Sequence, residues 1–552
     1  MHRGTLALFI PLAVALAQVP TDQKPATIEG TVVNSVIGSP LRKVELTLAN
    51  GQISPEMAAM MGQVGPSASA GQLTHVATKT LATVTDAAGK FHFQVPSGIW
   101  WLKAQKPGFA DGWYPPKHGP LHLAAGQEMT HAEIRLVPYG TLSGHVLDED
   151  GDPFPTAMVS ALSYRFIFGR PRLMYVDSAE TNSKGEFTLS KVPPGHYFLS
   201  ASVMRMGFAA SIPAPPADGA PETAYMSTYL PNSLDVADAQ KIDVAAAAEL
   251  SGFKIQLRKS LVVRLKGRLV DANGDPIKSG QVMLTGGDGH VGAMSLSTVS
   301  DAQGRFEIPY VQPGAYIAMT MHTQGSSRKI NSQPLVVPDR NVENLELGVG
   351  QEATIQGRVS VDDDAKLLPD EFRVRLMAAA GGGAAFAKAD KSGAFTLEHV
   401  ARESYDFMLD SSEGTYLKSV LFNDHESLGQ QLDCSAITTA TLRIVLGTDG
   451  GKLEARVSRD DKPAPDATVV LVPSDPNRRF PQNLRTGWSD ASGHLTLKDV
   501  PPGDYLAFAW EEVENGIWFD PEFLKSQTQG VRVQIGPKAT GQVDLTLIPA
   551  AR

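Results

Sequence analysis

One short phrase occurs five times along the 552 residues and constrains the fold more than any other feature. It reads Asp or Asn, two residues, Gly, one residue, then Phe or Leu. The Asx side chain can accept a hydrogen bond from the backbone two residues on, and the Gly can take the positive φ that closes a tight hairpin. The phrase therefore predicts five hairpins of one kind. Their turn glycines are Gly89, Gly185, Gly304, Gly393 and Gly493.

A second phrase opens each repeat, before the turn. It is a strand-like pattern in which apolar residues stand two positions before and two positions after a small central residue. A glycine inside a strand often marks a place where a bulky neighbour comes close, and we expect that neighbour to be the ring of the third phrase. The central residues are Gly30, Gly144, Gly267, Gly357 and Ala455.

The third phrase follows the turn and reads Val-Pro-Pro-Gly or a decayed version of it, with an aromatic ring two residues after the Gly position. Alternate residues of a strand face opposite sides of its sheet, and we expect the side that carries the ring to be buried. The rings are Trp100, Tyr197, Tyr316, Tyr405 and Tyr505.

The spacing of these phrases predicts the domain organisation. Short runs with period-2 apolar spacing lie between them, six or seven to a repeat, and the 51 Gly and 38 Pro are spread along the chain. Many short strands joined by many turns are typical of a β-sandwich. We predict an all-β chain of five tandem Ig-like or transthyretin-like antiparallel β-sandwich domains, arranged like beads on a string. The predicted domains are 26–138 with an inserted loop 53–73, 139–259 with a Pro/Ala-rich segment 211–223, 260–350, 351–448 and 449–549.

The first residues have the three regions of a signal peptide. Arg3 supplies the positive charge, residues 6–17 are apolar, and Ala15-Leu16-Ala17 is a small-residue cleavage site. The apolar run is too short to span a bilayer, and no later run approaches the ~20 residues that a membrane helix needs. We therefore expect residues 1–17 to be removed and the chain to be exported, to the periplasm, the cell surface or the medium.

The net charge and the cysteine content limit the classes of partner that the chain can bind. The formal net charge is −10 and no basic cluster stands out, so nucleic acid is not an expected partner. Cys434 is the only cysteine, which rules out a disulfide within the chain. A lone thiol could join two chains, but we favour a small buried hydrophobic residue.

Along the chain, each repeat has the opening strand first, then the turn, then the Val-Pro-Pro-Gly phrase. In that order the three phrases resemble the carboxypeptidase regulatory-like domain. The closest copies are those around Gly185, Gly304 and Gly493. The resemblance implies a transthyretin-like sandwich related to Cna B-type and starch-binding-like domains, and it extends over nearly the whole mature chain. It implies no activity, because that domain accompanies a peptidase and is not itself one.

The sequence offers little that could carry catalysis. We expect no catalytic residues, no metal and no cofactor. His131-Ala132-Glu133 lacks the cysteines that a zinc deaminase needs. Asp148 to Asp152 reads as a hairpin rather than a calcium loop, because the loop's closing Glu is missing. Lys266 and Asn344 could mimic the isopeptide pair of Cna B-type domains, but no other repeat has such a pair.

The aromatic residues are the most promising binding groups. All six Trp fall in the first and last repeats. We predict that Trp101 with Trp113 and Tyr114, and separately Trp518 with Phe519, are partly exposed and form two ligand-facing patches. The leading interpretation is a non-catalytic envelope or extracellular protein that serves as an interaction or structural scaffold for envelope proteins. The alternative is a carbohydrate-binding protein that holds polysaccharide on these patches; an enzyme is the interpretation we favour least.

Overall fold

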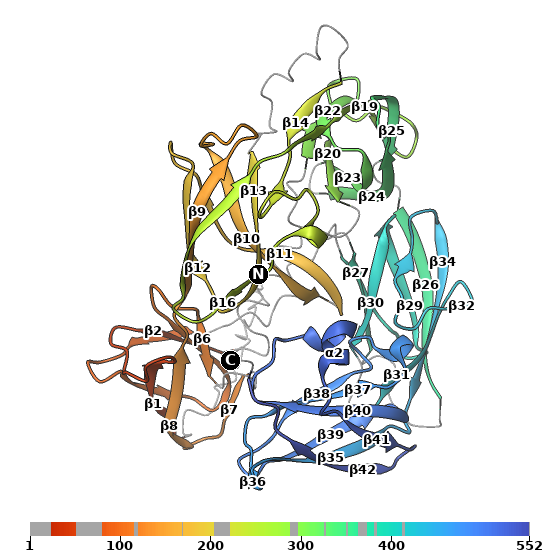
Figure 1. Cartoon of the computed structure of the whole chain (residues 1–552). Coiled ribbons are helices and arrows are strands. Elements are labelled where there is room, and N and C mark those ends of the chain that lie inside the picture. Colours follow the sequence, from red (N-terminus) through yellow and green to blue (C-terminus); the bar gives the residue numbers. More distant parts are fainter. Residues whose placement is uncertain are drawn as a thin grey trace, which may run out of the picture. The chain divides into compact units, whose positions relative to one another are not determined.

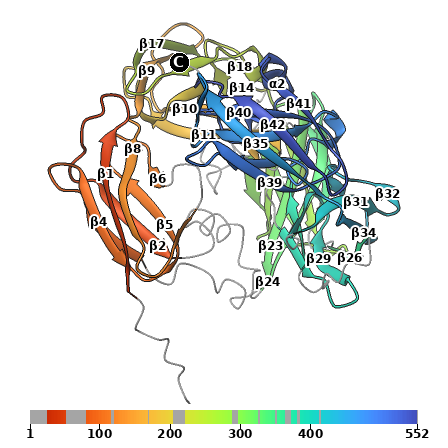
Figure 2. The same cartoon turned by 90° about the horizontal axis from the view of Figure 1, so that it is seen from below.

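The computed structural model describes residues 24–50, 80–114, 120–167, 169–203, 221–286, 296–324, 327–348, 352–362, 372–379, 384–410 and 414–550 (Figures 1 and 2). The predicted signal peptide 1–17, the inserted loop 53–73 and residues 211–220 of the Pro/Ala-rich segment lie outside these ranges. Within them, the sheets form five tandem sandwiches, as the repeat predicts, together with one small two-stranded sheet. No helix in these ranges is long and apolar enough to cross a membrane.

Sandwich 1 consists of β1 (Ala26–Asn34), β2 (Glu45–Asn50), β3 (Thr80–Val84), β4 (Lys90–Val95), β5 (Gly98–Gln105), β6 (Gly112–Tyr114), β7 (Leu121–Leu123) and β8 (Glu128–Leu136). One sheet has the order β4-β1-β8. The other has the order β3-β2-β5-β6, and β7 also pairs with β5.

Sandwich 2 consists of β9 (Gly140–Leu147), β10 (Ala157–Ile167), β11 (Arg170–Glu180), β12 (Glu186–Val192), β13 (Gly195–Val203), β15 (Thr228–Tyr229), the 3-10 helix η1 (Val236–Asp238), β16 (Ile242–Val244) and β17 (Glu249–Gln256). Its sheets have the orders β12-β9-β17 and β11-β10-β13-β15, and β16 pairs with β13. The small separate sheet pairs β14 (Thr223–Tyr225) with β18 (Lys259–Leu261).

Sandwich 3 consists of β19 (Val263–Val270), β20 (Gln281–Gly286), β21 (Leu296–Val299), β22 (Arg305–Val311), β23 (Gly314–Gln324), β24 (Ser327–Val337) and β25 (Val342–Gly348). Its sheets have the orders β22-β19-β25 and β21-β20-β23-β24.

Sandwich 4 consists of β26 (Glu352–Val361), β27 (Arg373–Ala378), β28 (Ala384–Lys388), β29 (Ala394–Ala401), β30 (Ser404–Asp410), β31 (Tyr416–Phe422), β32 (His425–Glu426), β33 (Leu432–Asp433) and β34 (Thr439–Gly447). Its sheets have the orders β29-β26-β34-β31-β32 and β28-β27-β30-β33.

Sandwich 5 consists of β35 (Gly451–Arg459), β36 (Lys462–Pro463), β37 (Thr468–Pro473), η3 (Pro476–Arg478), β38 (Arg485–Trp488), β39 (His494–Val500), β40 (Gly503–Trp510), η4 (Ile517–Phe519), α2 (Pro521–Ser526), β41 (Val531–Ile535) and β42 (Thr540–Thr546). Its sheets have the orders β36-β35-β39, in which β42 also pairs with β35, and β38-β37-β40-β41.

One pairing in every sandwich is not antiparallel. The closing strand runs parallel to the opening strand: β8 to β1, β17 to β9, β25 to β19, β34 to β26 and β42 to β35. The closing strand does not follow its partner through a hairpin but returns to it from the other sheet. A tight turn therefore does not force the two strands to be antiparallel.

The repeated turn has the geometry that its residues predict. All five turn glycines have φ between +71° and +80°. In sandwich 3, the Asp301 carboxylate accepts hydrogen bonds from the backbone N–H groups of Gln303 and Arg305, at 2.8 Å each. These bonds hold the pKa of the Asp301 carboxyl below its usual value. A Cβ on Gly304 would lie 2.7 Å from the Leu269 carbonyl oxygen, so only glycine fits without strain.

The small residue of the opening strand faces a different ring from the one expected. Its direct cross-strand partner is the Phe of the turn phrase, for example Phe306 opposite Gly267 and Phe395 opposite Gly357. A Cβ on Gly357 would lie 2.0 Å from the Phe395 ring. The expected partner, the ring of the third phrase, lies in the opposite sheet of each sandwich.

In sandwiches 1 to 3, a second group leaves no room for a Cβ atom at this glycine. Their closing strands carry a β-bulge beside it, whose extra residues His131, Gly252 and Asn344 all have positive φ. The bulge brings a carbonyl oxygen over the glycine, and in sandwich 3 the Leu345 oxygen lies 2.0 Å from a Cβ on Gly267. The pairings of β34 and β42 with their opening strands have no such bulge.

The ring of the third phrase makes the same contact in all five sandwiches. Its polar hydrogen is donated to the backbone carbonyl four residues earlier. The Tyr197 hydroxyl lies 2.7 Å from the Pro193 oxygen, and Trp100 Nε1 lies 3.1 Å from the Pro96 oxygen. Tyr316, Tyr405 and Tyr505 donate to Gln312, Ala401 and Pro501 in the same way. Trp or Tyr fits this position because each joins a large apolar body to one hydrogen-bond donor.

Contacts divide the chain into two compact units. Among the described residues, the first contains 24–50, 80–106, 111–114 and 120–136, which make up sandwich 1. The second contains 107–110 and the described residues from Val137 onward, which make up sandwiches 2 to 5. The second unit is thus more than a row of independent beads, because its four sandwiches contact one another directly.

Candidate functional site

The first predicted patch lies on the outward face of the sheet β3-β2-β5-β6. In β5, Trp100 and Leu102 are buried while Trp101, between them, is partly exposed. β6 pairs with β5 so that Trp113 stands opposite Lys103 on the same face as Trp101. The two indoles meet edge to face, with ring centroids 6.3 Å apart and planes at 89°.

Three polar side chains complete this face and were not predicted as site residues. The Lys103 ammonium lies 5.3 Å from the Trp113 ring centroid and 2.8 Å from a carboxylate oxygen of Asp111. Gln105 Nε2 donates to both Asp111 oxygens at 3.1 Å. Lys103 and Gln105 follow Trp101 at strand spacing, and that spacing was the signal that could have found them. The five side chains Trp101, Lys103, Gln105, Asp111 and Trp113 are called the indole face below.

Tyr114 does not belong to the indole face. It stands opposite Leu102, whose side chain is buried in the sandwich, so it takes the other side of the sheet. The prediction that Tyr114 shares a patch with Trp113 was wrong. Residues 112–114 form a strand, and adjacent residues of a strand point to opposite sides.

The second predicted patch is not a free surface. Trp518 is only 7% exposed and packs with Val470, Val472, Phe508 and Trp510 on the outer side of a sheet of sandwich 5. The prediction that it is exposed was wrong. The segment 517–526 folds as η4 and α2 over that side of the sheet, with Asp520 capping α2 through the Glu522 N–H, and it places the Trp518 indole underneath.

Phe519 is partly exposed, but its ring contacts another sandwich. The hairpin β10-β11 of sandwich 2 brings Phe166 against it, with ring centroids 6.4 Å apart. On the same hairpin, Arg165 forms an ion pair with Glu514 of sandwich 5 at 2.7 Å. The patch assigned to a ligand is therefore used, at least in part, for a contact within the chain.

The same hairpin also reaches sandwich 4. Arg170 Nε lies 3.0 Å from an Asp406 carboxylate oxygen, and Arg172 donates to the Ala379 carbonyl oxygen at 2.9 Å. The Asp406 side chain is only 12% exposed, so its ion pair is screened less than a surface pair. Sandwich 2 is thus joined to sandwiches 4 and 5 by cationic side chains of a single hairpin.

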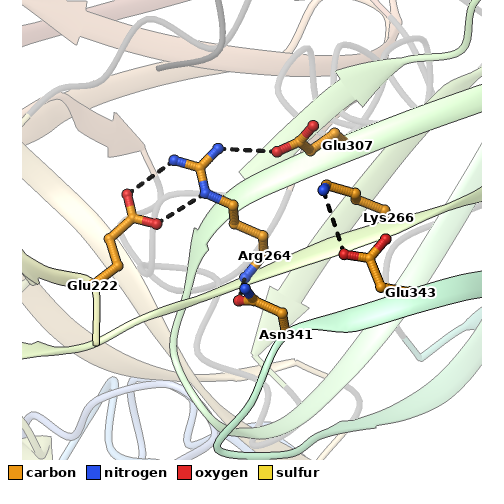
Figure 3. Close-up of polar contacts among 6 residues, drawn as sticks. All are labelled: Glu222, Arg264, Lys266, Glu307, Asn341 and Glu343. Atoms are coloured by element: carbon orange, nitrogen blue, oxygen red, sulfur yellow. Dashed lines mark hydrogen bonds and ion pairs between the residues drawn. The ribbon is translucent and has the colours of Figure 1, made fainter. Parts of the chain in front are cut away.

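A buried arginine joins sandwich 2 to sandwich 3 (Figure 3). Arg264 of β19 has a side chain that is 2% exposed, and it lies between Glu222 and Glu307. Both outer edges of its guanidinium are used: Nε and Nη2 bind the two Glu222 oxygens at 2.9 and 3.1 Å, and Nη1 binds Glu307 at 2.9 Å. Glu222 precedes β14, which pairs with β18 directly before β19, so this contact fixes the connection at the sandwich 2–3 joint.

A buried carboxyl lies where sandwich 4 meets sandwich 3. Glu403 is 3% exposed, between β29 and β30, and β29 contacts β24 of sandwich 3. Burial raises the pKa of the Glu403 carboxyl to about 7, and the nearby hydroxyls of Ser332 and Tyr405 offset only part of that rise. Neither Ser332 Oγ nor Glu403 Oε2 has a hydrogen-bond partner of good geometry among the described residues. This joint therefore contains an ionisable group without full compensation.

The other motifs weighed in the sequence are structural. Asp148 accepts hydrogen bonds from the N–H groups of Asp150 and Asp152, which is a plain Asx turn. Lys266 forms an ion pair with Glu343 at 3.3 Å, while Asn344 is the exposed bulge residue (Figure 3 shows Lys266 and Glu343). Cys434 is buried, as expected, and burial raises the pKa of its thiol to about 12. Among the described residues, no group of three or more His, Cys, Asp or Glu side chains could hold a metal ion.

No protein-family model and no curated protein matches the chain. Similar solved structures include GBS52, the minor pilin of Streptococcus agalactiae, at 15% identity and a TM-score of 0.23, covering 42% of this chain and 96% of the pilin. The Bacillus anthracis TIE protein is 11% identical with a TM-score of 0.16, covering 73% and 72%. BcpA, the major pilin subunit of Bacillus cereus, is 12% identical with a TM-score of 0.16, covering 59% and 99%. At such TM-scores these similarities carry no argument about function.

Proposed function

We propose that the chain is an exported, non-catalytic scaffold built from carboxypeptidase regulatory-like modules. The observation that carries this proposal is the way in which sandwiches 2 to 5 are tied together. The Arg264 pairs join sandwiches 2 and 3, and the contact of β29 with β24 joins 3 and 4. The β10-β11 hairpin joins 2 to both 4 and 5. A chain whose neighbouring domains are held by buried and partly buried contacts is suited to keeping surfaces at fixed positions.

Cell fractionation tests the export part of this proposal. A C-terminally tagged chain should be recovered outside the cytoplasm, and N-terminal sequencing should find Gln18 as its first residue, because residues 15–17 form the cleavage site. Recovery only from the cytoplasm, or an intact Met1 on the exported chain, would contradict it. Turnover of generic peptide or glycan substrates by the purified chain would contradict the non-catalytic part.

Carbohydrate binding is the second candidate function. The observation that favours it is the indole face, where two Trp rings and a fixed carboxylate occur together on sandwich 1. Trp518 no longer supports it, because its indole is buried. A scaffold of this kind can also carry a binding face, so the two functions are compatible and are tested separately.

A further inference from the structure

The indole face is a corner rather than a flat platform. Because the Trp101 and Trp113 planes stand at 89°, one ring can form the floor of a site while the other forms its wall. Cross-strand pairing places Ala49 opposite Trp101 and Thr47 opposite Lys103, so the neighbouring strand adds only small side chains at these positions. Such a corner suits a ligand with a flat apolar face.

The polar groups beside this corner are held in fixed positions. Asp111 receives two hydrogen bonds from Gln105 and an ion pair from Lys103, whose own side chain is only 21% exposed. A carboxylate has roughly four lone-pair sites, of which these contacts use three, so Asp111 can still accept one hydrogen bond from a ligand. A preorganised acceptor of this kind suits a ligand hydroxyl group, because little ordering is needed on binding.

The charges around the indole face restrict the class of ligand further. Lys103 is compensated by Asp111, and Glu45 stands opposite Gln105 on the adjacent strand, so this part of the face carries one positive and two negative side chains. Carboxylated or sulfated sugars would be repelled. A neutral pyranose with equatorial hydroxyls fits best, because its axial C–H groups present a flat apolar face to an indole and its hydroxyls point to the side.

We infer that the indole face binds a neutral, equatorially hydroxylated glycan such as a β-linked glucan. This inference rests on the proposed extracellular location, where such polymers are encountered. It names the ligand class for the second candidate function, and it assigns Lys103, Gln105 and Asp111 to the site together with the two indoles. Gly112 is needed as well, because a Cβ there would lie 2.5 Å from the Leu136 side chain and would push β6 away from the core.

Titration of the purified mature chain with cellohexaose tests this inference, and binding is measured by calorimetry and by Trp fluorescence. Saturable weak binding is expected, with polygalacturonate and heparin giving none. Trp113→Ala should weaken binding by roughly tenfold or more, since it removes most of the apolar contact of one ring. Asp111→Ala should also weaken it. Trp488→Ala, which alters an exposed indole on sandwich 5, should leave binding unchanged and is the matched control.

Trp113→Phe serves if the Ala variant does not fold, because it keeps an aromatic contact with Trp101 and should retain part of the affinity. A folded, exported wild-type chain that binds no neutral oligosaccharide would overturn this inference and leave the scaffold proposal intact. Binding that survives Trp113→Ala, or that prefers the anionic polymers, would overturn it as well. Failure of export would instead contradict the proposed function, whatever the purified chain binds.

Discussion

The strand residue and the turn residue that face each other in every sandwich are matched in size. Four sandwiches pair a Gly with a Phe, as in Gly357 with Phe395. Sandwich 5 instead pairs Ala455 with Leu495. When the ring becomes a smaller side chain, the strand can carry a methyl group. The two positions therefore form one packing unit, although they lie about 40 residues apart in the sequence, and about 60 apart in sandwich 1.

Gly357→Ala should destabilise sandwich 4 by about 1–3 kcal/mol, because the added methyl group meets the Phe395 ring. Adding Phe395→Leu should recover most of this loss and reproduce the pair found in sandwich 5. The matched control is Gly267→Ala with Phe306→Leu. That pair should not recover, since the Leu345 carbonyl oxygen also blocks the methyl group. Denaturant unfolding of the single and double variants measures the coupling, and equal recovery at both sites would contradict the account.

Local features could be predicted from the sequence, while features set by strand register could not. The turn glycines follow from residues a few positions apart, and so do the rings of the third phrase, which are buried in four sandwiches and partly buried at Tyr316. The partner of the strand glycine depends on which strands are neighbours, and the phrases do not reveal that. The bulge at His131 and Asn344 has no sequence pattern that the sandwiches share, since sandwich 2 uses Gly252 there.

At the scale of elements, the segments that cover a surface decide what it can bind. Trp518 and Phe519 resembled an exposed patch because their own sequence is a loop rich in aromatic residues. What covers Phe519 is the β10-β11 hairpin, about 350 residues earlier in the chain, and no local pattern points to it. Among the described residues, Trp113 is partly exposed, as predicted.

The Glu403 carboxyl should make the sandwich 3–4 joint sensitive to pH. Its pKa is about 7 in the folded chain, against an ordinary value of 4.5, so the folded state binds its proton more tightly than the unfolded state. The contribution of Glu403 to the free energy of unfolding should be largest below about pH 4.5. As the pH rises towards 7, this contribution should fall by about 3 kcal/mol in all, and it should level off at higher pH.

Glu403→Gln should remove this part of the pH dependence, because an amide of the same shape does not ionise. The measurement is the free energy of unfolding of the second unit between pH 4.5 and 8 for the wild type and the variant. Ser332→Ala is the comparison variant: it keeps the carboxyl and should keep the pH dependence, with a larger fall in stability, because the hydroxyl that partly offsets the rise in the Glu403 pKa is lost. If the wild type and Glu403→Gln have parallel pH profiles, Glu403 is not the group that titrates.

At the scale of the whole molecule, the two compact units should unfold separately. Sandwich 1 makes its own core, whereas sandwiches 2 to 5 share ion pairs and aromatic contacts that are lost together when one of them opens. Calorimetry of the mature chain should therefore show one transition for sandwich 1 and one cooperative transition for the second unit.

Two turn variants assign these transitions. A Cβ on Gly89 would lie 2.7 Å from the Val32 oxygen, and one on Gly185 would lie 2.6 Å from the Val146 oxygen, each at a glycine with positive φ. Replacement by Val should cost about 1–2 kcal/mol at either turn. Gly89→Val should lower only the transition of sandwich 1, by about 4–8 °C per kcal/mol, as expected for a domain of that size.

Gly185→Val should instead lower the whole transition of the second unit, and by fewer degrees, because a larger cooperative unit has a larger unfolding entropy. Phe166→Ala with Arg165→Ala removes the aromatic contact and the ion pair between sandwiches 2 and 5, and it should lower that transition without splitting it. Sandwich 5 then still packs Phe480 into the core of sandwich 4. Gly185→Val, as the only substitution, could instead lower a separate transition whose unfolding enthalpy is that of one sandwich. The contacts between sandwiches would then contribute little to stability. The chain would then behave as the independent series of domains that its repeats first suggest.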